Sequence, residues 1–297
     1  MTVSNFYKNI FGTKVYKISV SAGCTCPNRD GTIGFGGCIF CGQAGSGDFV
    51  PDSFLEIEQQ IEKAKMLLAP KLKNQENVKY IAYFQNFTNT YGDIDKLKNL
   101  WFRALSCPDV AGISIATRPD CLSDECLEVI SLLAKKTFVQ VELGLQSTNE
   151  KTAALIRRGY QNKIYFDAVK KLHDVDCKIH VVSHVIFGLP CESECDMLKT
   201  VFDVVNAKSD GIKITNLYVL AQTDLQKMFE KGEYKPLEME EYFELLKKAL
   251  KIIPKNVVIH RLTGDPPKKI LIAPDWTKNK KLVLSRINNL LCDYERL

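Results

Sequence analysis

Three cysteines near the start of the chain have the spacing of ligands for an iron–sulfur cluster. Cys38 and Cys41 form a Cys-x-x-Cys pair, which puts two thiolates on one tight turn, and Cys26 precedes them across a glycine-rich loop. Glycine lets a backbone pass close to a bulky inorganic group. A [4Fe–4S] cluster is usually held by four thiolates. Three thiolates would therefore leave one iron open to a ligand from outside the protein.

Other interpretations of the same cysteines are open. Structural zinc usually takes four ligands as two short pairs, and the chain has no second Cys-x-x-Cys or His-x-His pair. The pair alone could be a redox-active dithiol or two cysteines of the core. Cys24 is a rival ligand, because residues i and i+2 of an extended segment share a face. We favour Cys26 because Pro27 and Asn28 begin a turn directly after it.

The overall composition is that of an ordinary globular protein. The chain has 297 residues, of which 45% are hydrophobic and 25% charged, enough for one large domain with an appendage. Its apolar runs are too short to span a membrane, and residues 1–14 lack the apolar core of an export signal. Eleven cysteines, an odd number, predict a reducing compartment and hence a cytoplasmic protein.

The positive charge is concentrated at the C-terminus. Residues 251–297 contain ten Lys or Arg and four Asp or Glu, a net +6, whereas the whole chain carries only +5. A basic segment on an otherwise neutral protein indicates a polyanionic partner. A solvated, lysine-rich surface is the alternative explanation.

Six apolar segments alternate with helical patterns along most of the chain. We expect barrel strands at Val15–Val20, Val78–Phe84, Gly112–Ala116, Phe138–Leu143, Ile179–Ile186 and Gly211–Tyr218, and a short strand at Val257–Leu262 beyond the barrel. This alternation predicts right-handed βαβ units and a parallel sheet. We expect a partial (β/α)6 TIM-like barrel over residues 15–220, an N-terminal segment over residues 1–14, and a basic C-terminal α+β extension over residues 221–297 that packs on the barrel.

Polar residues follow several of these strands directly. They occupy Gln85–Thr90, Thr117–Asp120, Gly144–Ser147 and Gly188–Pro190. In a β/α barrel the carboxyl ends of the strands form the face that carries the active site. A Gly-x-Gly-x-x-Gly turn for a dinucleotide is absent between strand and helix. An iron with an open position beside a barrel mouth is what radical S-adenosylmethionine (SAM) chemistry requires.

Five segments together carry a resemblance to a known family. They are Thr25-Cys26-Pro27-Asn28-Arg29-Asp30-Gly31, Gly36-Gly37-Cys38-x-Phe40-Cys41, Thr117-Arg118-Pro119-Asp120, Glu142-Leu143-Gly144-Leu145-Gln146-Ser147 and His260-Arg261-Leu262-Thr263-Gly264-Asp265. Over nearly its whole length the chain resembles the radical SAM enzymes of the YtqA/YhcC type. These enzymes are relatives of the radical SAM domain in the catalytic subunit of Elongator.

The resemblance implies roles for individual residues. The cluster ligands would be Cys26, Cys38 and Cys41; the family usually has an aromatic residue at position 24, which leaves Cys24 out. The residues that would contact SAM are Phe40, Gln85, Thr88, Gln146, Arg158 and His184. The candidates for contacting substrate are Arg118, His260 and Arg261.

Structural alternatives to these roles are open. His184 could be a buried core histidine, Gln146 a cap at a strand end, and Arg118 a partner of Asp120. His260 and Arg261 could instead close the open side of the barrel.

The resemblance also implies an activity. A reduced [4Fe–4S] cluster passes one electron to SAM, which gives methionine and a 5′-deoxyadenosyl radical that abstracts a hydrogen atom from the substrate. A flavodoxin or ferredoxin would supply the electron. Relatives in the Elongator line modify wobble uridines of tRNA, and this family is linked to converting a carboxymethylaminomethyl group on uridine C5 to aminomethyl. The alternatives are a radical SAM oxidoreductase acting on a small molecule and a non-catalytic iron–sulfur carrier.

Overall fold

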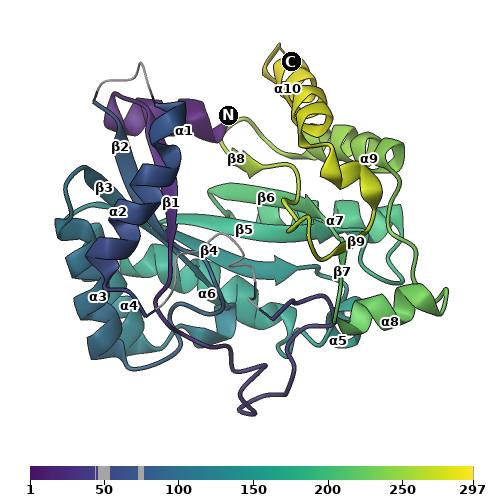
Figure 1. The fold of residues 1–297 in the computed structure, drawn as a ribbon, viewed down its shortest axis with the longest axis horizontal. Helices are drawn as coiled ribbons and strands as arrows, with labels where there is room; N and C mark the ends of the chain where they lie inside the picture. The colour runs from purple at the N-terminus through teal and green to yellow at the C-terminus, as the bar shows by residue number, and fades with distance from the viewer. Residues whose placement is uncertain (44, 46–53, 73–76, 297) are drawn as a thin grey trace.

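A curled sheet of seven parallel strands forms the centre of the protein (Figure 1). The computed structural model describes residues 1–43, 45, 54–72 and 77–296. In spatial order the strands are β1 (Val15–Val20), β2 (Lys79–Phe84), β3 (Val110–Thr117), β4 (Phe138–Gln146), β5 (His180–Phe187), β6 (Gly211–Asn216) and β8 (Val258–Arg261). The predicted partial barrel is therefore confirmed.

The seventh strand of the sheet was not predicted to belong to the barrel. β8 pairs in parallel with β6, and its residues Val258 and Ile259 are only 2% and 3% exposed. The helix α9 (Met239–Ile252) lies between them in the chain, so the two strands form one more β–helix–β unit. The sheet thus has seven strands rather than six because the C-terminal part of the chain extends it.

Alternating side chains explain how each strand serves two surfaces. On β4, Val139 and Val141 belong to the main hydrophobic core, and they are at most 1% exposed. Their neighbour Glu142 points to the opposite face, as successive residues of a strand do, and lines the interior of the barrel. The apolar face is covered by helices, and the polar face is enclosed by the curl of the sheet.

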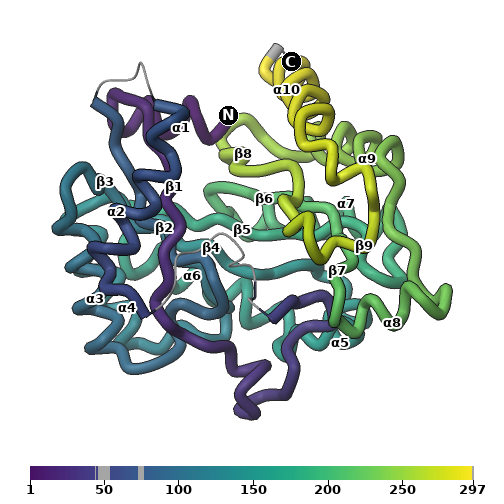
Figure 2. The backbone as a smooth tube through the Cα atoms, viewed as in Figure 1, coloured from purple at the N-terminus to yellow at the C-terminus, as the bar shows by residue number. Residues whose placement is uncertain are grey.

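Helices cover the outer face of the sheet (Figure 2). They are α2 (Ile57–Leu68), α3 (Ile94–Ser106), α4 (Asp124–Ala134), α5 (Glu150–Leu155), α6 (Asn162–Val175) and α7 (Glu194–Asn206). Short polar side chains cap their N-termini, including Asp93 before α3 and Ser123 before α4. Short 3-10 turns lie at Ala69–Lys71, Pro119–Cys121 and Asp275–Lys278. No described helix has the length and apolar character needed to cross a lipid bilayer.

The N-terminal segment lies at the open side of the barrel, against the first and last strands of the sheet. The first helix, α1 (Val3–Phe11), lies beside β1 and β8, and Thr2 forms a β-bridge with Ile259 (Figure 1). The remaining elements form the C-terminal part of the protein together with α9. They are β7 (Val219–Leu220), α8 (Asp224–Glu230), β9 (Leu271–Ala273) and α10 (Lys280–Arg296), with β7 and β9 paired antiparallel.

Candidate active site in the half-barrel

A cavity of about 470 Å³ opens at the carboxyl ends of the strands. We call it the barrel cavity. This volume is within the range of sites that bind small molecules or cofactors. Its walls include the three cysteines of the predicted cluster, which are Cys26, Cys38 and Cys41. The structure therefore brings residues from the loop after β1 together with strand ends that lie far away in the sequence.

Backbone hydrogen bonds fold the cysteine loop into two turns. The N–H of Arg29 donates to the carbonyl of Cys26 at 2.8 Å, and the N–H of Cys41 donates to the carbonyl of Cys38 at 2.9 Å. A third bond, from the N–H of Gly37 to the carbonyl of Asn28 at 2.8 Å, joins these two parts of the loop. Gly37 has a φ of 82°, a conformation that glycine adopts without strain. The loop thus holds the cysteines in place through its own backbone.

The surroundings of the sulfur atoms suit thiolates bound to a metal cluster. Arg29 Nη1 lies 3.3 Å from Cys41 Sγ, and Asn28 Nδ2 lies 3.7 Å from Cys38 Sγ, so both sulfurs are near N–H donors. Burial, with the nearby thiols of Cys41 and Cys26, raises the pKa of Cys38 to about 12. The thiolate of Cys38 is therefore disfavoured unless a cation such as iron binds it.

Two alternatives for this loop were a zinc site and Cys24 as a ligand in place of Cys26. Among the described residues, no three His, Cys, Asp or Glu side chains are grouped so as to hold a single metal ion, which gives no support to a zinc site. A cluster differs from a single ion because its thiolates bind separate iron atoms. Cys24 packs against the main hydrophobic core and does not line the barrel cavity, whereas Cys26 does.

Gln146 at the end of β4 presents an unsatisfied oxygen in the cavity wall. Its Oε1 atom is buried without a hydrogen-bond partner, and its backbone has a φ of 70°. A β-bulge between Gly144 and Gln146 changes the pairing with β5 at this point. A buried acceptor without a donor costs about 1–3 kcal/mol. Gln146 is therefore placed to accept a hydrogen bond from a bound molecule.

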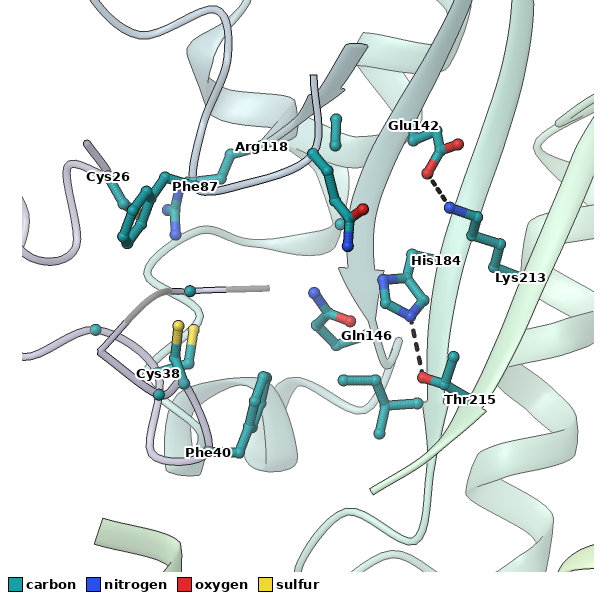
Figure 3. A pocket seen from close by; sticks show the side chains of 18 of the residues that line it. Cys26, Cys38, Phe40, Phe87, Arg118, Glu142, Gln146, His184, Lys213 and Thr215 are labelled. Atoms are coloured by element: carbon teal, nitrogen blue, oxygen red, sulfur yellow. Dashed lines mark hydrogen bonds and ion pairs between the residues drawn. The ribbon is translucent and has the colours of Figure 1, made fainter. Parts of the chain in front are cut away.

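His184, on the neighbouring strand β5, lies close to Gln146 (Figure 3), and its imidazole is neutral. Burial, reinforced by the positive charge of Lys213, lowers its pKa to about 3. Its Nε2 atom is 3.0 Å from Thr215 Oγ1 on β6. Figure 3 shows Cys26 and Cys38 on one side of the pocket and Lys213 on the other, with His184 and Gln146 between them. A molecule spanning the pocket would touch both of these polar groups.

The other residues predicted to contact SAM also reach the cavity. Phe40 lines it from the cysteine loop, between Cys38 and Cys41. Gln85 lines it from the end of β2, where its Oε1 accepts a hydrogen bond from Ser19 Oγ at 2.8 Å. Thr88 is 1% exposed, and its N–H donates to the carbonyl of Thr25 at 3.2 Å, which ties the cysteine loop to β2.

Arg158 and Arg118 line the cavity but are engaged with the protein itself. The guanidinium of Arg158, which is 1% exposed, donates to the carbonyls of Leu145, Ser147 and Tyr160 and to the side chain of Asn162. It therefore fixes the turn after β4. Arg118 makes two bonds to Asp120, at 2.9 and 2.7 Å. The pairing of Arg118 with Asp120 was one of the alternatives open from the sequence.

His260 and Arg261 face different surroundings although they are adjacent. The Nε2 atom of His260 is 2.8 Å from that of His180, and both rings pack near Phe6 of α1. His260 does not line the barrel cavity. Arg261 does, and among the described residues its guanidinium has no ion pair or hydrogen bond.

A buried charged network below these residues was not found from the sequence. Glu142, 4% exposed, binds both Lys17 of β1 and Lys213 of β6, and accepts a hydrogen bond from Tyr83 at 2.7 Å. Burial raises the pKa of Glu142, but the two ammonium groups outweigh it and keep that pKa well below the usual range. The only signal in the sequence was a lysine within each of two apolar strands.

Two family models together match nearly the whole chain. The model described as the radical SAM superfamily matches residues 25–204, and the one described as the radical SAM C-terminal domain matches residues 209–291. The chain belongs to the radical SAM superfamily. Solved structures of this superfamily contain a [4Fe–4S] cluster and SAM, and cleavage of SAM by the cluster is the general chemistry of the family.

Individual relatives support the resemblance seen in the sequence. The uncharacterized protein YtqA of Bacillus subtilis is 41% identical over 290 residues, covering 98% of this chain and 88% of YtqA. A tRNA uridine(34) acetyltransferase of Methanocaldococcus jannaschii is 31% identical over 57% of this chain and 31% of that protein. The structure of archaeal Elp3 from Methanocaldococcus infernus has a TM-score of 0.65 at 19% identity, covers 92% of this chain and 63% of that one, and shows a shared fold.

Proposed function

We propose that this radical SAM protein modifies the wobble uridine of tRNA, converting a carboxymethylaminomethyl group on C5 to aminomethyl. Loss of a hydrogen atom, and then of one electron and a proton, from the carboxymethylamino group would give an imine, with the oxidised cluster as the electron acceptor. Hydrolysis of this imine by water would leave the aminomethyl group and release the two carbons as glyoxylate. The observation that carries the chemistry is the barrel cavity, where three cysteines face an unsatisfied polar group across an enclosed space. Cys26, Cys38 and Cys41 would hold the [4Fe–4S] cluster. With SAM bound, the reduced cluster supplies a 5′-deoxyadenosyl radical able to abstract a hydrogen atom from substrate.

The residues of the cavity would then orient SAM and exclude water. Phe40, between two ligands, offers an apolar ring for the adenine. Gln146 Oε1 would accept a hydrogen bond from an N–H or O–H of SAM, which removes its present lack of a partner. His184 stays neutral, so its ring can bind a ribose hydroxyl without adding charge. Arg158 would act indirectly, by fixing the backbone on either side of Gln146.

Two features support an RNA substrate. Relatives of this chain include proteins named tRNA uridine(34) acetyltransferase, whose similarity spans 57% of this chain. The C-terminal 47 residues carry a net +6, and cationic surfaces attract the phosphates of nucleic acids. A flavodoxin or ferredoxin would deliver the electron.

The test is an assay of SAM cleavage by protein whose cluster has been reconstituted without oxygen. The protein is reduced with dithionite in the presence of SAM, and 5′-deoxyadenosine is measured with and without tRNA that bears carboxymethylaminomethyluridine. We expect 5′-deoxyadenosine and aminomethyluridine to form together, and both to be lost in Cys38→Ala. Cleavage that is indifferent to tRNA would point to a small molecule as substrate. No cleavage by a fully loaded cluster would leave an iron–sulfur carrier.

A further inference from the structure

A second cavity lies at the open side of the half-barrel. It has a volume of about 570 Å³ and is lined by residues of α1, β1 and β8, and we call it the side cavity. The cationic side chains in its lining are Lys8, Lys14, Lys17, Lys213 and Arg261. Of the described residues that line it, none is Asp or Glu. Such a lining attracts an anion.

The two cavities meet at a shared wall. The residues that line both of them are Ser19, Tyr83, Gln85, Lys213 and Arg261. A group held at this wall is therefore reached from the open side of the barrel and also faces the cavity that contains the cysteines. The wall is the natural position for the reacting end of a substrate, with the rest of that substrate in the side cavity.

A β-bulge turns Arg261 toward Lys213. Gly211 pairs with Val258 and Ile212 with Ile259, but the register then shifts, so that Lys213 pairs with Arg261 rather than with His260. Bulges re-aim side chains in this way and are frequent beside active sites. Two cations directly opposite each other on neighbouring strands repel. The shifted register is thus unfavourable unless an anion lies between or beside the two side chains.

The protein itself supplies one anion for the two cations of this wall, Lys213 and Arg261, and for Lys17 beside it in the side cavity. Glu142 binds both Lys17 and Lys213, and Arg261 has no ion pair among the described residues. The sum of these four formal charges is +2. Arg261 is exposed and its guanidinium has no ion pair among the described residues, so a second carboxylate at the wall would find a cation ready to bind it. An arginine can bind a carboxylate through two parallel hydrogen bonds.

We propose that Arg261, with Lys213 and Lys17, binds the terminal carboxylate of the substrate's carboxymethyl group; this inference rests on the proposed function. A carboxylate at the end of a side chain can enter the shared wall, whereas a backbone phosphate is flanked by a sugar on each side. The phosphates would remain outside, near Lys8 and Lys14. Binding at the wall turns the carbon next to the carboxylate toward the barrel cavity, where the radical would form.

The experiment compares two anticodon stem-loop RNAs that differ only in the wobble base. One carries carboxymethylaminomethyluridine and the other aminomethyluridine, and their Kd values are measured with cluster-loaded, unreduced protein by fluorescence anisotropy. We expect the wild type to prefer the carboxylate-bearing RNA by roughly tenfold, equivalent to about 1.4 kcal/mol. Arg261→Gln should abolish the preference and Arg261→Lys should retain part of it. Arg286→Gln removes an arginine that pairs with Glu240 on α9, and should leave the preference intact.

The outcomes separate this inference from the proposed function. Equal binding of both RNAs by the wild type, or an undiminished preference in Arg261→Gln, overturns the carboxylate site even if tRNA is the substrate. If the wild type binds neither RNA, the proposed substrate is wrong, and the site is then tested by calorimetric titration with sarcosine, which carries the same carboxymethylamino group. Sarcosine binding that is lost in Arg261→Gln supports the site. Its absence, or its independence of Arg261, overturns it.

Discussion

Replacing Glu142 with glutamine tests whether one carboxylate neutralises two buried ammonium groups. Glu142 is 4% exposed and binds both Lys17 and Lys213, so Glu142→Gln leaves two buried cations without their counter-ion. Breaking a buried ion pair from one side typically costs about 3–5 kcal/mol. With a urea m-value of about 3 kcal/mol/M, the unfolding midpoint should fall by roughly 1–1.7 M.

The pH dependence of this loss has a definite sign. Burial lowers the pKa of Lys17 from 10.5 to about 7, and it lowers that of Lys213 too. These two lysines therefore bind fewer protons in the folded state than in the unfolded chain between pH 7 and 10.5, and their contribution to stability rises with pH in that range. In Glu142→Gln both lysines have lost the carboxylate that favours their charged forms. We expect the rise of stability with pH to begin at a lower pH in the variant than in the wild type.

The assay is urea unfolding of cluster-loaded protein without oxygen, followed by far-ultraviolet circular dichroism at several pH values. Lys213→Met is the matched control, because it leaves an ordinary one-to-one pair between Lys17 and Glu142 and nearly preserves the side-chain volume. We expect it to cost less than about 1.5 kcal/mol. A Glu142→Gln variant within about 1 kcal/mol of the wild type would refute the shared-carboxylate reasoning, as would a Lys213→Met variant that is equally destabilised.

Burial raises the pKa of Glu192 from 4.5 to about 7, so the protein loses stability as the pH rises through this range. Glu192→Gln should remove that loss and raise the free energy of unfolding by up to about 3 kcal/mol above pH 7. A change in Tm that is the same at pH 5 and pH 8 would contradict this prediction. A Cβ atom on Gly211 would lie 2.6 Å from the ring of His260. Gly211→Ala should therefore lower the free energy of unfolding by about 1–3 kcal/mol, measured by thermal unfolding. An unchanged Tm would show that the ring can move. Changing all three lysines of the basic run, residues 278–281, to glutamine should weaken tRNA binding. The slope of log K against log salt should decrease by the equivalent of about one charge, because two of the three lysines already form ion pairs within the chain. An unchanged slope in filter-binding measurements would show that the RNA binds elsewhere.

The sequence predicted the barrel well because its signals are local. Each of the first six strands is an apolar run, and polar segments mark the carboxyl ends. Three of the four polar segments predicted there contribute residues to the barrel cavity, and the fourth, Gly188–Pro190, does not. β8 was recognised as a strand but not as part of the barrel. It has only four residues, and its pairing with β6 depends on contacts across more than forty residues of chain. Such pairing leaves no mark in a local pattern.

The site was harder to predict than the barrel. The sequence shows which residue types are present, but not which groups their side chains bind in the folded protein. Arg158 was expected to bind SAM because a guanidinium suits a carboxylate, yet its donors are used by the turn after β4. Lys17 and Lys213 were passed over, since a lysine in a strand ordinarily faces solvent. Only the curl of the sheet brings both ammonium groups to Glu142. The charge balance inside the barrel is a property of the assembled sheet.

The anchoring of the cysteine loop also has a consequence in time. The N–H of Ile39 donates to the carbonyl of Ile156, and the carbonyl of Ile39 accepts from the N–H of Leu225. At a synthesis rate of roughly 5–20 residues per second, the ribosome adds Leu225 about 10 to 40 seconds after Ile39. The loop that carries the cysteines is thus among the first segments made, whereas its contact with Leu225 can form only much later. A cluster inserted before Leu225 has been synthesised would therefore be held by a loop that still lacks this contact.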